Sequence, residues 1–150
     1  MMKLIIGNDH AGTELKFEIK KYLEEKGYEV ENYGTDSTES VNYPEIGAGL
    51  AEKVAAHEAD LGILICGTGV GISLAANKVP GIRAAVCSDV TTAHLVREHN
   101  HANILAFGAR IVGSELAKDM VDAFLNAKPL GGRHAERVEM ITAVEKKYSK

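Results

Sequence analysis

The feature that most constrains the fold is a regular alternation of short apolar runs with longer segments of helical spacing. Runs typical of buried strands recur five times along the chain, at residues 3–7, 29–33, 61–65, 83–87 and 104–107. After each run, apolar residues return every three or four positions, as on the buried face of a helix. Strands that alternate with helices in this way form a parallel sheet covered on both faces. The sequence therefore predicts an α/β fold: a three-layer αβα sandwich around a Rossmann-like five-stranded parallel sheet.

The boundaries of the expected helices follow from capping and breaking residues. The first helix ends before Gly27, and Pro44 stands where the second can begin. Asp89 can cap the fourth helix, and a C-terminal helix follows the break at residues 129–132. We expect the strands in the order 2-1-3-4-5, and the length of 150 residues indicates a single domain, residues 1–150.

A glycine-rich loop follows the third apolar run and begins with a cysteine. The segment Cys66-Gly-Thr-Gly-Val-Gly71 joins the strand expected at 61–65 to the opening of a helix at 72–78. Glycines let backbone N–H groups approach a ligand closely, and a helix N-terminus leaves unpaired donors with a partial positive charge. Both features favour a thiolate at Cys66 and an anion beside it.

Several well-known loop motifs do not fit this segment. No Gly-Lys-Ser/Thr follows for a phosphate-binding Walker A loop. A dinucleotide fingerprint needs a third glycine at position 72, and a tyrosine-phosphatase loop needs arginine there, whereas the chain has Ile72. No Cys-x-x-Cys pair supplies a resolving partner for redox cycling. The loop is therefore either an oxyanion site beside a reactive cysteine or a tight turn with a buried, inert one.

The composition excludes several classes of function. A net charge of −4 without a basic run argues against nucleic-acid binding and against a polybasic membrane anchor. No apolar stretch reaches the length of a membrane span, and no signal-peptide pattern opens the chain. The two cysteines, Cys66 and Cys87, are too few for a disulfide scaffold, so we expect a reducing cytoplasm. Cys87 is expected to be a small apolar residue of the sheet.

Polar side chains follow the expected strands at their carboxyl ends. Asp9 and His10 follow the first strand, and Tyr43 lies near the end of the loop after the second. Asp89 follows the fourth strand and Arg110 the fifth, with the cysteine loop after the third. Ligands of open parallel sheets bind beyond this edge. The five loops together favour a small-molecule site.

Each candidate also has a purely structural alternative. Asp9 could cap the first helix. The hydroxyl of Thr68 could stabilise its own turn instead of an oxyanion. Arg110 could form an ordinary ion pair with a carboxylate. The spacing alone leaves these alternatives open.

Two arginines stand four residues apart where the last helix is expected to begin. Arg133 and Arg137 repel each other at this spacing by about 0.2–0.5 kcal/mol on an isolated helix. A shared phosphate dianion would reverse the sign of that interaction. Solvated arginines, or ion pairs with Glu136 or Glu139, are the alternative, and His134 fits either arrangement.

Histidines close the fourth expected helix. His99 can move protons near neutral pH, although a helix C-terminus accepts any histidine as a cap. A zinc site would need three or four ligands in one tetrahedron. Asp9, His10, His99 and His101 are candidates, but no spacing forces them together, so we expect no metal.

Eight short motifs run in order along nearly the whole chain: Asn-Asp-His-Ala-Gly12, Asn-Tyr-Pro44, Ile-Cys-Gly-Thr-Gly-Val-Gly71, Ala-Ala-Asn-Lys78, Gly-Ile-Arg83, Arg-Glu-His-Asn100, Ala-Phe-Gly-Ala-Arg110 and Gly-Gly-Arg-His-x-x-Arg137. Together they resemble the type B ribose-5-phosphate isomerases. The resemblance implies a sugar-phosphate isomerase with a five-stranded αβα fold and neither metal nor cofactor. It also implies a homodimer, possibly arranged as a tetramer, whose sites draw residues from both subunits.

The resemblance assigns a role to each matching residue. Cys66 is implied as the base that removes a proton from carbon, His99 as the group that assists opening of the furanose ring, and Thr68 as a further catalytic group. The implied anion hole comprises Gly67, Thr68, Gly69, Val70 and Gly71. The implied contacts to sugar hydroxyls are Asp9, His10, Tyr43 and Asn100, and those to phosphate are Arg110, Arg133, His134 and Arg137. One branch of the family has a glutamate base at the position of Ile72, so this chain resembles the cysteine branch.

The expected reaction is the interconversion of D-ribose 5-phosphate and D-ribulose 5-phosphate through an enediolate, a step of the non-oxidative pentose phosphate pathway. Isomerisation of allose 6-phosphate or galactose 6-phosphate is the nearest alternative. A non-catalytic sugar-phosphate-binding module is another, in which Cys66 and His99 would be idle. A flavodoxin-like nucleotide-binding module is disfavoured because the dinucleotide fingerprint is missing.

Overall fold

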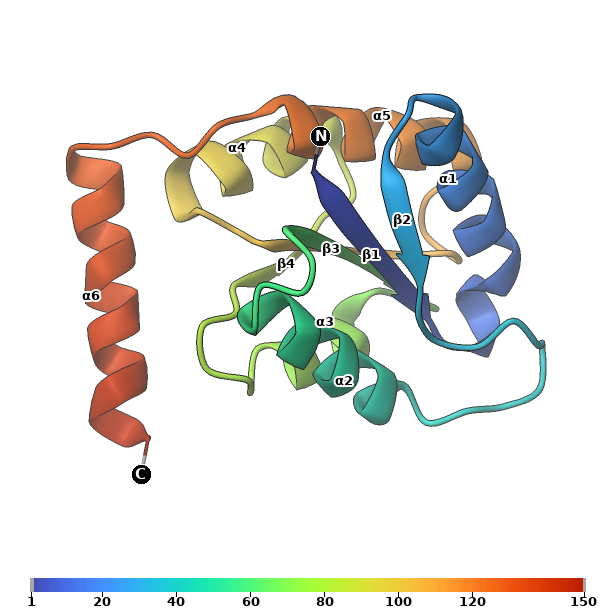
Figure 1. The fold of residues 1–150 in the computed structure, drawn as a ribbon, viewed down its shortest axis with the longest axis horizontal. Coiled ribbons are helices and arrows are strands. Elements are labelled where there is room, and N and C mark those ends of the chain that lie inside the picture. The colour runs from blue at the N-terminus through green and yellow to red at the C-terminus, as the bar shows by residue number, and fades with distance from the viewer. Residues whose placement is uncertain (1, 150) are drawn as a thin grey trace.

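The computed structural model describes residues 2–149, and its five strands form one parallel sheet (Figure 1). The strands are β1 (Lys3–Asn8), β2 (Glu29–Asn32), β3 (Leu61–Cys66), β4 (Ala84–Val86) and β5 (Ile104–Gly108). All four pairings are parallel, and the central register places Ile63 of β3 between Ile6 of β1 and Leu105 of β5. The predicted α/β class and the five predicted strands are confirmed.

The predicted strand order is wrong at one edge of the sheet. The observed order is β2-β1-β3-β5-β4, so β5 pairs with β3 and β4 lies outside it. The reason is the apolar content of the two strands. All five residues of β5 are buried, as expected of a strand covered on both faces, whereas β4 has three residues that are half-buried or exposed. The short strand β4 therefore lies at the edge of the sheet, where a strand forms hydrogen bonds to only one neighbouring strand.

The part of the chain that the structure describes has six α-helices, which surround and flank the sheet. A 3₁₀ turn, η1 (His10–Gly12), precedes α1 (Thr13–Glu25), and the remaining helices are α2 (Tyr43–Ala55), α3 (Val70–Ala76), α4 (Val90–Asn100), α5 (Ser114–Asn126) and α6 (Arg133–Tyr148). The predicted cap of α4 is confirmed, because the Asp89 carboxylate accepts a hydrogen bond from the Thr92 amide at 2.6 Å. Within residues 2–149, no helix is both long and apolar enough to cross a bilayer.

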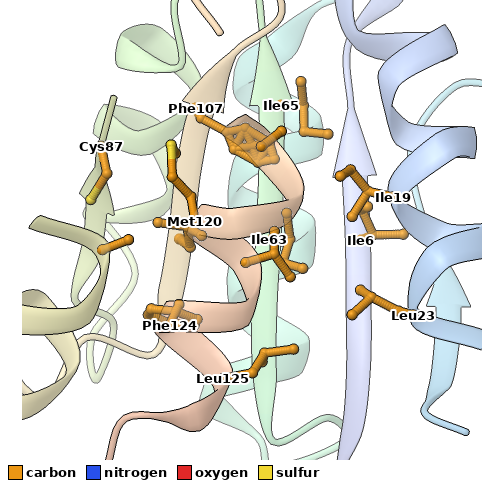
Figure 2. Packing of buried hydrophobic residues seen from close by; sticks show 14 of the residues in the cluster. Ile6, Ile19, Leu23, Ile63, Ile65, Cys87, Phe107, Met120, Phe124 and Leu125 are labelled. Atoms are coloured by element: carbon orange, nitrogen blue, oxygen red, sulfur yellow. The ribbon is translucent and has the colours of Figure 1, made fainter. Parts of the chain in front are cut away.

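Two separate apolar clusters cover the two faces of the sheet. Helices α1, α4 and α5 lie on one face and α2 and α3 on the other, as Figure 1 shows. In Figure 2, Ile19 and Leu23 of α1 and Phe124 of α5 reach toward strand side chains such as Ile63. Alternate residues of a strand point to opposite faces, so Ile65 enters this cluster while Cys66 faces α2 and α3.

Helix α6 stands apart from these three layers (Figure 1). Only Val138 is buried along its length, through contacts near its first turns. Four large apolar side chains further along are exposed: Met140, Ile141, Val144 and Tyr148. A groove of about 650 Å³ lies between this helix and the region of β4. The helix therefore presents an apolar face that its own chain leaves mostly uncovered.

Candidate active site

The pairing of β3 with β5 brings candidate residues together beyond the carboxyl ends of the strands. We call this group the rim: Asp9, His10, Tyr43, residues 66–71 and Arg110. The Asp9 amide, just after β1, donates to the Ile65 carbonyl at 3.1 Å. On the other side, the Ala109 amide donates to the Cys66 carbonyl at 2.8 Å, and the Arg110 amide to the Gly67 carbonyl at 3.0 Å. The loops after β1, β3 and β5 are thus joined by backbone hydrogen bonds.

Cys66 ends β3 with its side chain 5 % exposed. The Gly69 amide donates a hydrogen bond to the Cys66 Sγ at 3.1 Å. Gly69 precedes the first residue of α3 and has φ +82°, a left-handed conformation that glycine adopts without strain. This backbone N–H and the start of α3 place partial positive charge against the sulfur.

Around Cys66, Thr68 and Val70 of the glycine loop are exposed, Gly67 and Gly71 are half-buried, and Gly69 is buried. The Thr68 hydroxyl accepts from the Val70 amide at 3.2 Å, which is the turn hydrogen bond considered above, and Thr68 is exposed. The guanidinium of Arg110 lies over Gly67, because a Cβ there would be 3.6 Å from Arg110 Nε. At Gly71, a Cβ would come within 2.5 Å of the Tyr43 ring. That loop position is therefore small because an aromatic side chain packs against it.

Asp9 and His10 lie at the opposite side of the same rim. Asp9 is buried and its Oδ1 accepts from the Ala11 amide at 3.0 Å, so it does cap the 3₁₀ turn. The Nδ1 of His10 accepts from the Val41 amide at 3.2 Å. In the neutral ring the proton is then on Nε2, which is left free as a donor. The cap and this hydrogen bond fix both side chains.

A second group of candidates lies elsewhere, where the end of α4 meets the start of α6. The rings of His99 and His134 stack with centroids 4.3 Å apart and planes within 1°. Burial lowers the pKa of His134, and the positive charges of His99, Arg133 and Arg137 lower it further. The loop between α5 and α6 is held against the end of α4, because the Leu130 amide donates to the Glu98 carbonyl at 3.0 Å. We call the group that surrounds this stacked pair the helix-end cluster: His99, Asn100, Arg133, His134 and Arg137.

The rim lies at the carboxyl ends of the strands, and the helix-end cluster lies at their amino ends. Arg83, just before β4, donates from Nε to the carbonyls of Asn100 at 3.1 Å and His101 at 3.0 Å. The end of α4 therefore lies at the amino edge of the strands, while Cys66 lies at the carboxyl edge. Strand β5 runs between these two ends of the sheet. From Ile104 to Gly108 it rises roughly 13 Å. A single chain thus brings His99 and Asn100 to the arginines of α6, but not to Cys66.

Within residues 2–149, the three candidate phosphate-binding arginines have no acidic partner. Among residues 2–149, the ion pairs join other residues, and none includes Arg110, Arg133 or Arg137. The alternative of ion pairs with Glu136 or Glu139 is therefore not realised.

Over residues 2–149, no three histidine, cysteine, aspartate or glutamate side chains gather as metal ligands would. Burial raises the pKa of the second cysteine, Cys87, to about 11, as fits a small apolar residue.

The sequence analysis missed one residue beside the rim. Lys16 is fully buried in α1, and its Nζ donates to the Thr35 carbonyl at 2.8 Å. The available signal was its spacing, since Lys16 is three and seven residues before Ile19 and Leu23 on the apolar stripe of α1.

Comparison with known proteins identifies relatives along almost the whole chain. The sequence model of the family described as Ribose/Galactose Isomerase matches residues 4–141. Ribose-5-phosphate isomerase B of Escherichia coli K12 is 56% identical over 147 residues, covering 98% of this chain and 99% of that protein.

Solved structures agree with this result. Ribose-5-phosphate isomerase B of Clostridium thermocellum superimposes with a TM-score of 0.97 at 58% identity, covering 99% of this chain and 100% of that one. The Mycoplasma genitalium enzyme with bound ribulose 5-phosphate superimposes at 0.93 with 40% identity and 97% coverage of both chains. With its fold, its cysteine-glycine loop and its full-length relatives in agreement, the chain belongs to the ribose/galactose isomerase family.

Proposed function

We propose that this chain interconverts D-ribose 5-phosphate and D-ribulose 5-phosphate through an enediolate. The observation that carries the proposal is the Cys66 sulfur at the carboxyl edge of the sheet with the Gly69 amide 3.1 Å from it. Such a sulfur can act as a base where a developing oxyanion is also stabilised. The relatives named ribose-5-phosphate isomerase B, at 56% and 58% identity, support this substrate.

Cys66 is the proposed base. Its thiolate takes the proton from C2 of the open-chain aldose, and the C2–H electron pair forms the C1–C2 double bond as the O1 carbonyl becomes an oxyanion. The thiol then returns a proton to C1 while the O2 proton moves to O1, which leaves the ketose. Backbone N–H groups of residues 67–71 and the Thr68 hydroxyl stabilise the enediolate, at about 3–4 kcal/mol for a key donor.

The remaining roles follow from the two groups of side chains. At the rim, Asp9, His10 and Tyr43 contact sugar hydroxyls, and Arg110 beside Gly67 contributes to phosphate binding. From the helix-end cluster, His99 assists ring opening and Asn100 contacts a hydroxyl. Phosphate is held chiefly by Arg133, His134 and Arg137, whose binding energy orients the reacting carbons far from it.

We infer that a second copy of the chain completes the site in a homodimer. The observation favouring this is that Cys66 and His99 lie at opposite edges of the sheet, so each chain offers two incomplete halves. The exposed apolar face of α6 and the groove of about 650 Å³ beside it supply a surface that a second copy would bury. Two such dimers would associate into the tetramer that the resemblance also allows. We place the enzyme in the cytoplasm, as the few cysteines suggest.

Replacing Cys66 by alanine removes the proposed base. We expect kcat to fall about 10²- to 10⁴-fold, because that is the usual contribution of a positioned general base, with KM changed little. The rate of ketose formation from ribose 5-phosphate gives both constants. Cys87→Ala is the matched control and should keep wild-type activity. Full turnover by Cys66→Ala would refute the role of the sulfur.

A second measurement compares substrates. Higher kcat/KM on allose or galactose 6-phosphate than on ribose 5-phosphate would assign the chain to hexose phosphates instead.

A shared site predicts complementation between inactive chains. Cys66→Ala and His99→Ala subunits, given two different tags and purified as mixed dimers, should recover about half the wild-type activity per dimer, because one of the two sites is then intact. The control pairs Cys66→Ala with the doubly substituted chain, which should stay inactive. If the mixed dimers are no more active than their parents, each subunit works with its own residues or the dimer is absent.

Phosphate binding should change the titration of His134. Desolvation, followed by neighbouring positive charges, holds the pKa of His134 below its ordinary value, and a bound dianion stabilises the protonated ring, so the pKa rises on binding. A histidine NMR titration with sulfate, which is dianionic throughout, should shift the midpoint upward relative to chloride at equal ionic strength. His134→Gln assigns the signal. An unchanged midpoint would argue against a phosphate site at this position.

A further inference from the structure

Lys16 is a buried cation that no step of the proposed mechanism uses. Its side chain has no exposed surface, and its Nζ donates to the Thr35 carbonyl at 2.8 Å and to the Asp36 carboxylate. The hydrogen bond from Lys16, assisted by Asn32, holds the pKa of Asp36 below its usual range. A lysine is seldom fully buried, and it remains so only where its charge is paired.

The two residues that Lys16 holds begin the segment 34–42, which lacks apolar anchors. Every residue of this segment is exposed or half-buried, and Val41 is its only aliphatic side chain. A groove of about 590 Å³ lies along Thr35, Val41 and the start of α2. Packing therefore contributes little to the position of the segment, and polar contacts must set it.

Those polar contacts connect Lys16 to the rim. At one end, Thr35 is held by Lys16 and by the Asn8 amide, whose Nδ2 donates to its carbonyl at 3.0 Å. In the middle, the Thr13 hydroxyl donates to the Ser37 carbonyl at 2.7 Å. At the other end, the Val41 amide donates to His10 Nδ1 at 3.2 Å. The segment is thus hydrogen-bonded to Lys16 near one end and to the imidazole of His10 near the other.

We propose that Lys16 is a positioning residue for substrate binding: it orders the segment 34–42 so that the Val41 amide fixes His10 with Nε2–H facing the sugar. This inference rests on the proposed function, in which His10 contacts a substrate hydroxyl. Lys16 does not touch the substrate. It acts through a backbone segment that also leads directly into Tyr43, the first residue of α2.

Lys16→Met separates positioning from stability. Methionine keeps the length of the apolar stem, and the substitution leaves no buried charge unpaired, because the Asp36 side chain is 59% exposed. The fold should therefore survive while the segment loses its anchor. Lys20→Met is the matched control: Lys20 is in the same helix and pairs with Glu24 at 3.0 Å on the partly exposed surface.

Steady-state kinetics on ribose 5-phosphate give the first readout. For Lys16→Met we expect KM to rise about 10-fold with kcat within about twofold, since a contact made equally in ground and transition states is lost. A merely structural role would lower the active fraction, and so the apparent kcat, without moving KM. Lys20→Met should match the wild type in both constants.

Nitrogen NMR of the His10 ring gives a second readout that needs no substrate. At about pH 8, where an ordinary imidazole is neutral, the wild type and Lys20→Met should show one tautomer, with the proton on Nε2. Lys16→Met should show both tautomers in exchange. If wild-type protein fails to turn over any sugar phosphate, the proposed function is wrong, and the tautomer alone then decides the role of Lys16.

An unchanged KM together with a single His10 tautomer in folded Lys16→Met would overturn the proposal. Should that variant fail to fold, Asp36→Asn replaces it, because it removes the partner charge at an exposed position while its amide oxygen can still accept from the buried ammonium. We then expect the same direction of change, with KM raised about threefold and mixed tautomers. Wild-type KM and tautomer in Asp36→Asn would likewise contradict the role of Lys16.

Discussion

The pairing of β3 with β5 is the constraint on which the rim depends. It aligns Cys66 with Gly108 and so brings the turn at residues 108–110 directly beside the glycine loop. The approach is so close that a Cβ on Gly108 would lie 2.6 Å from the Gly67 carbonyl oxygen. A glycine is needed there, and because it is present the guanidinium of Arg110 reaches over the loop. Had β4 occupied this position, as the sequence order suggested, Asp89 and its negative charge would have stood beside the sulfur.

Local structure could be predicted from the sequence, whereas the order of the strands could not. Apolar runs, Pro44 and the Asp89 cap locate strands and helices because each signal acts within a few residues. Strand order depends on which strand can be covered on both faces, and it required comparing the buried β5 with the short β4. Lys16 was missed for a similar reason, since its partners Thr35 and Asp36 are about twenty residues away and carry no pattern.

The direction of the chain explains why the candidate residues divide into two groups. Helix α4 starts after β4 at the carboxyl edge and must return to the amino edge before β5 can begin, so its last residues end far from Cys66. The spacing of residues along the chain did not show this separation, because His99 lies between β4 and β5 in the sequence and is close to both. In the proposed dimer the same geometry becomes useful: the cationic helix-end cluster meets the rim of a second copy, and neither half works alone.

In the proposed mechanism a proton, not a hydride, moves between C1 and C2, and Cys66 carries it. The most direct measurement is solvent exchange: ribose 5-phosphate is incubated with the protein in D₂O, and C2 of the recovered aldose is examined by proton NMR. We predict that deuterium enters C2, because the proton held by the sulfur exchanges with solvent before some of the enediolate collapses back. Conversion to ketose with no deuterium at either carbon, or binding without any exchange, would contradict this mechanism.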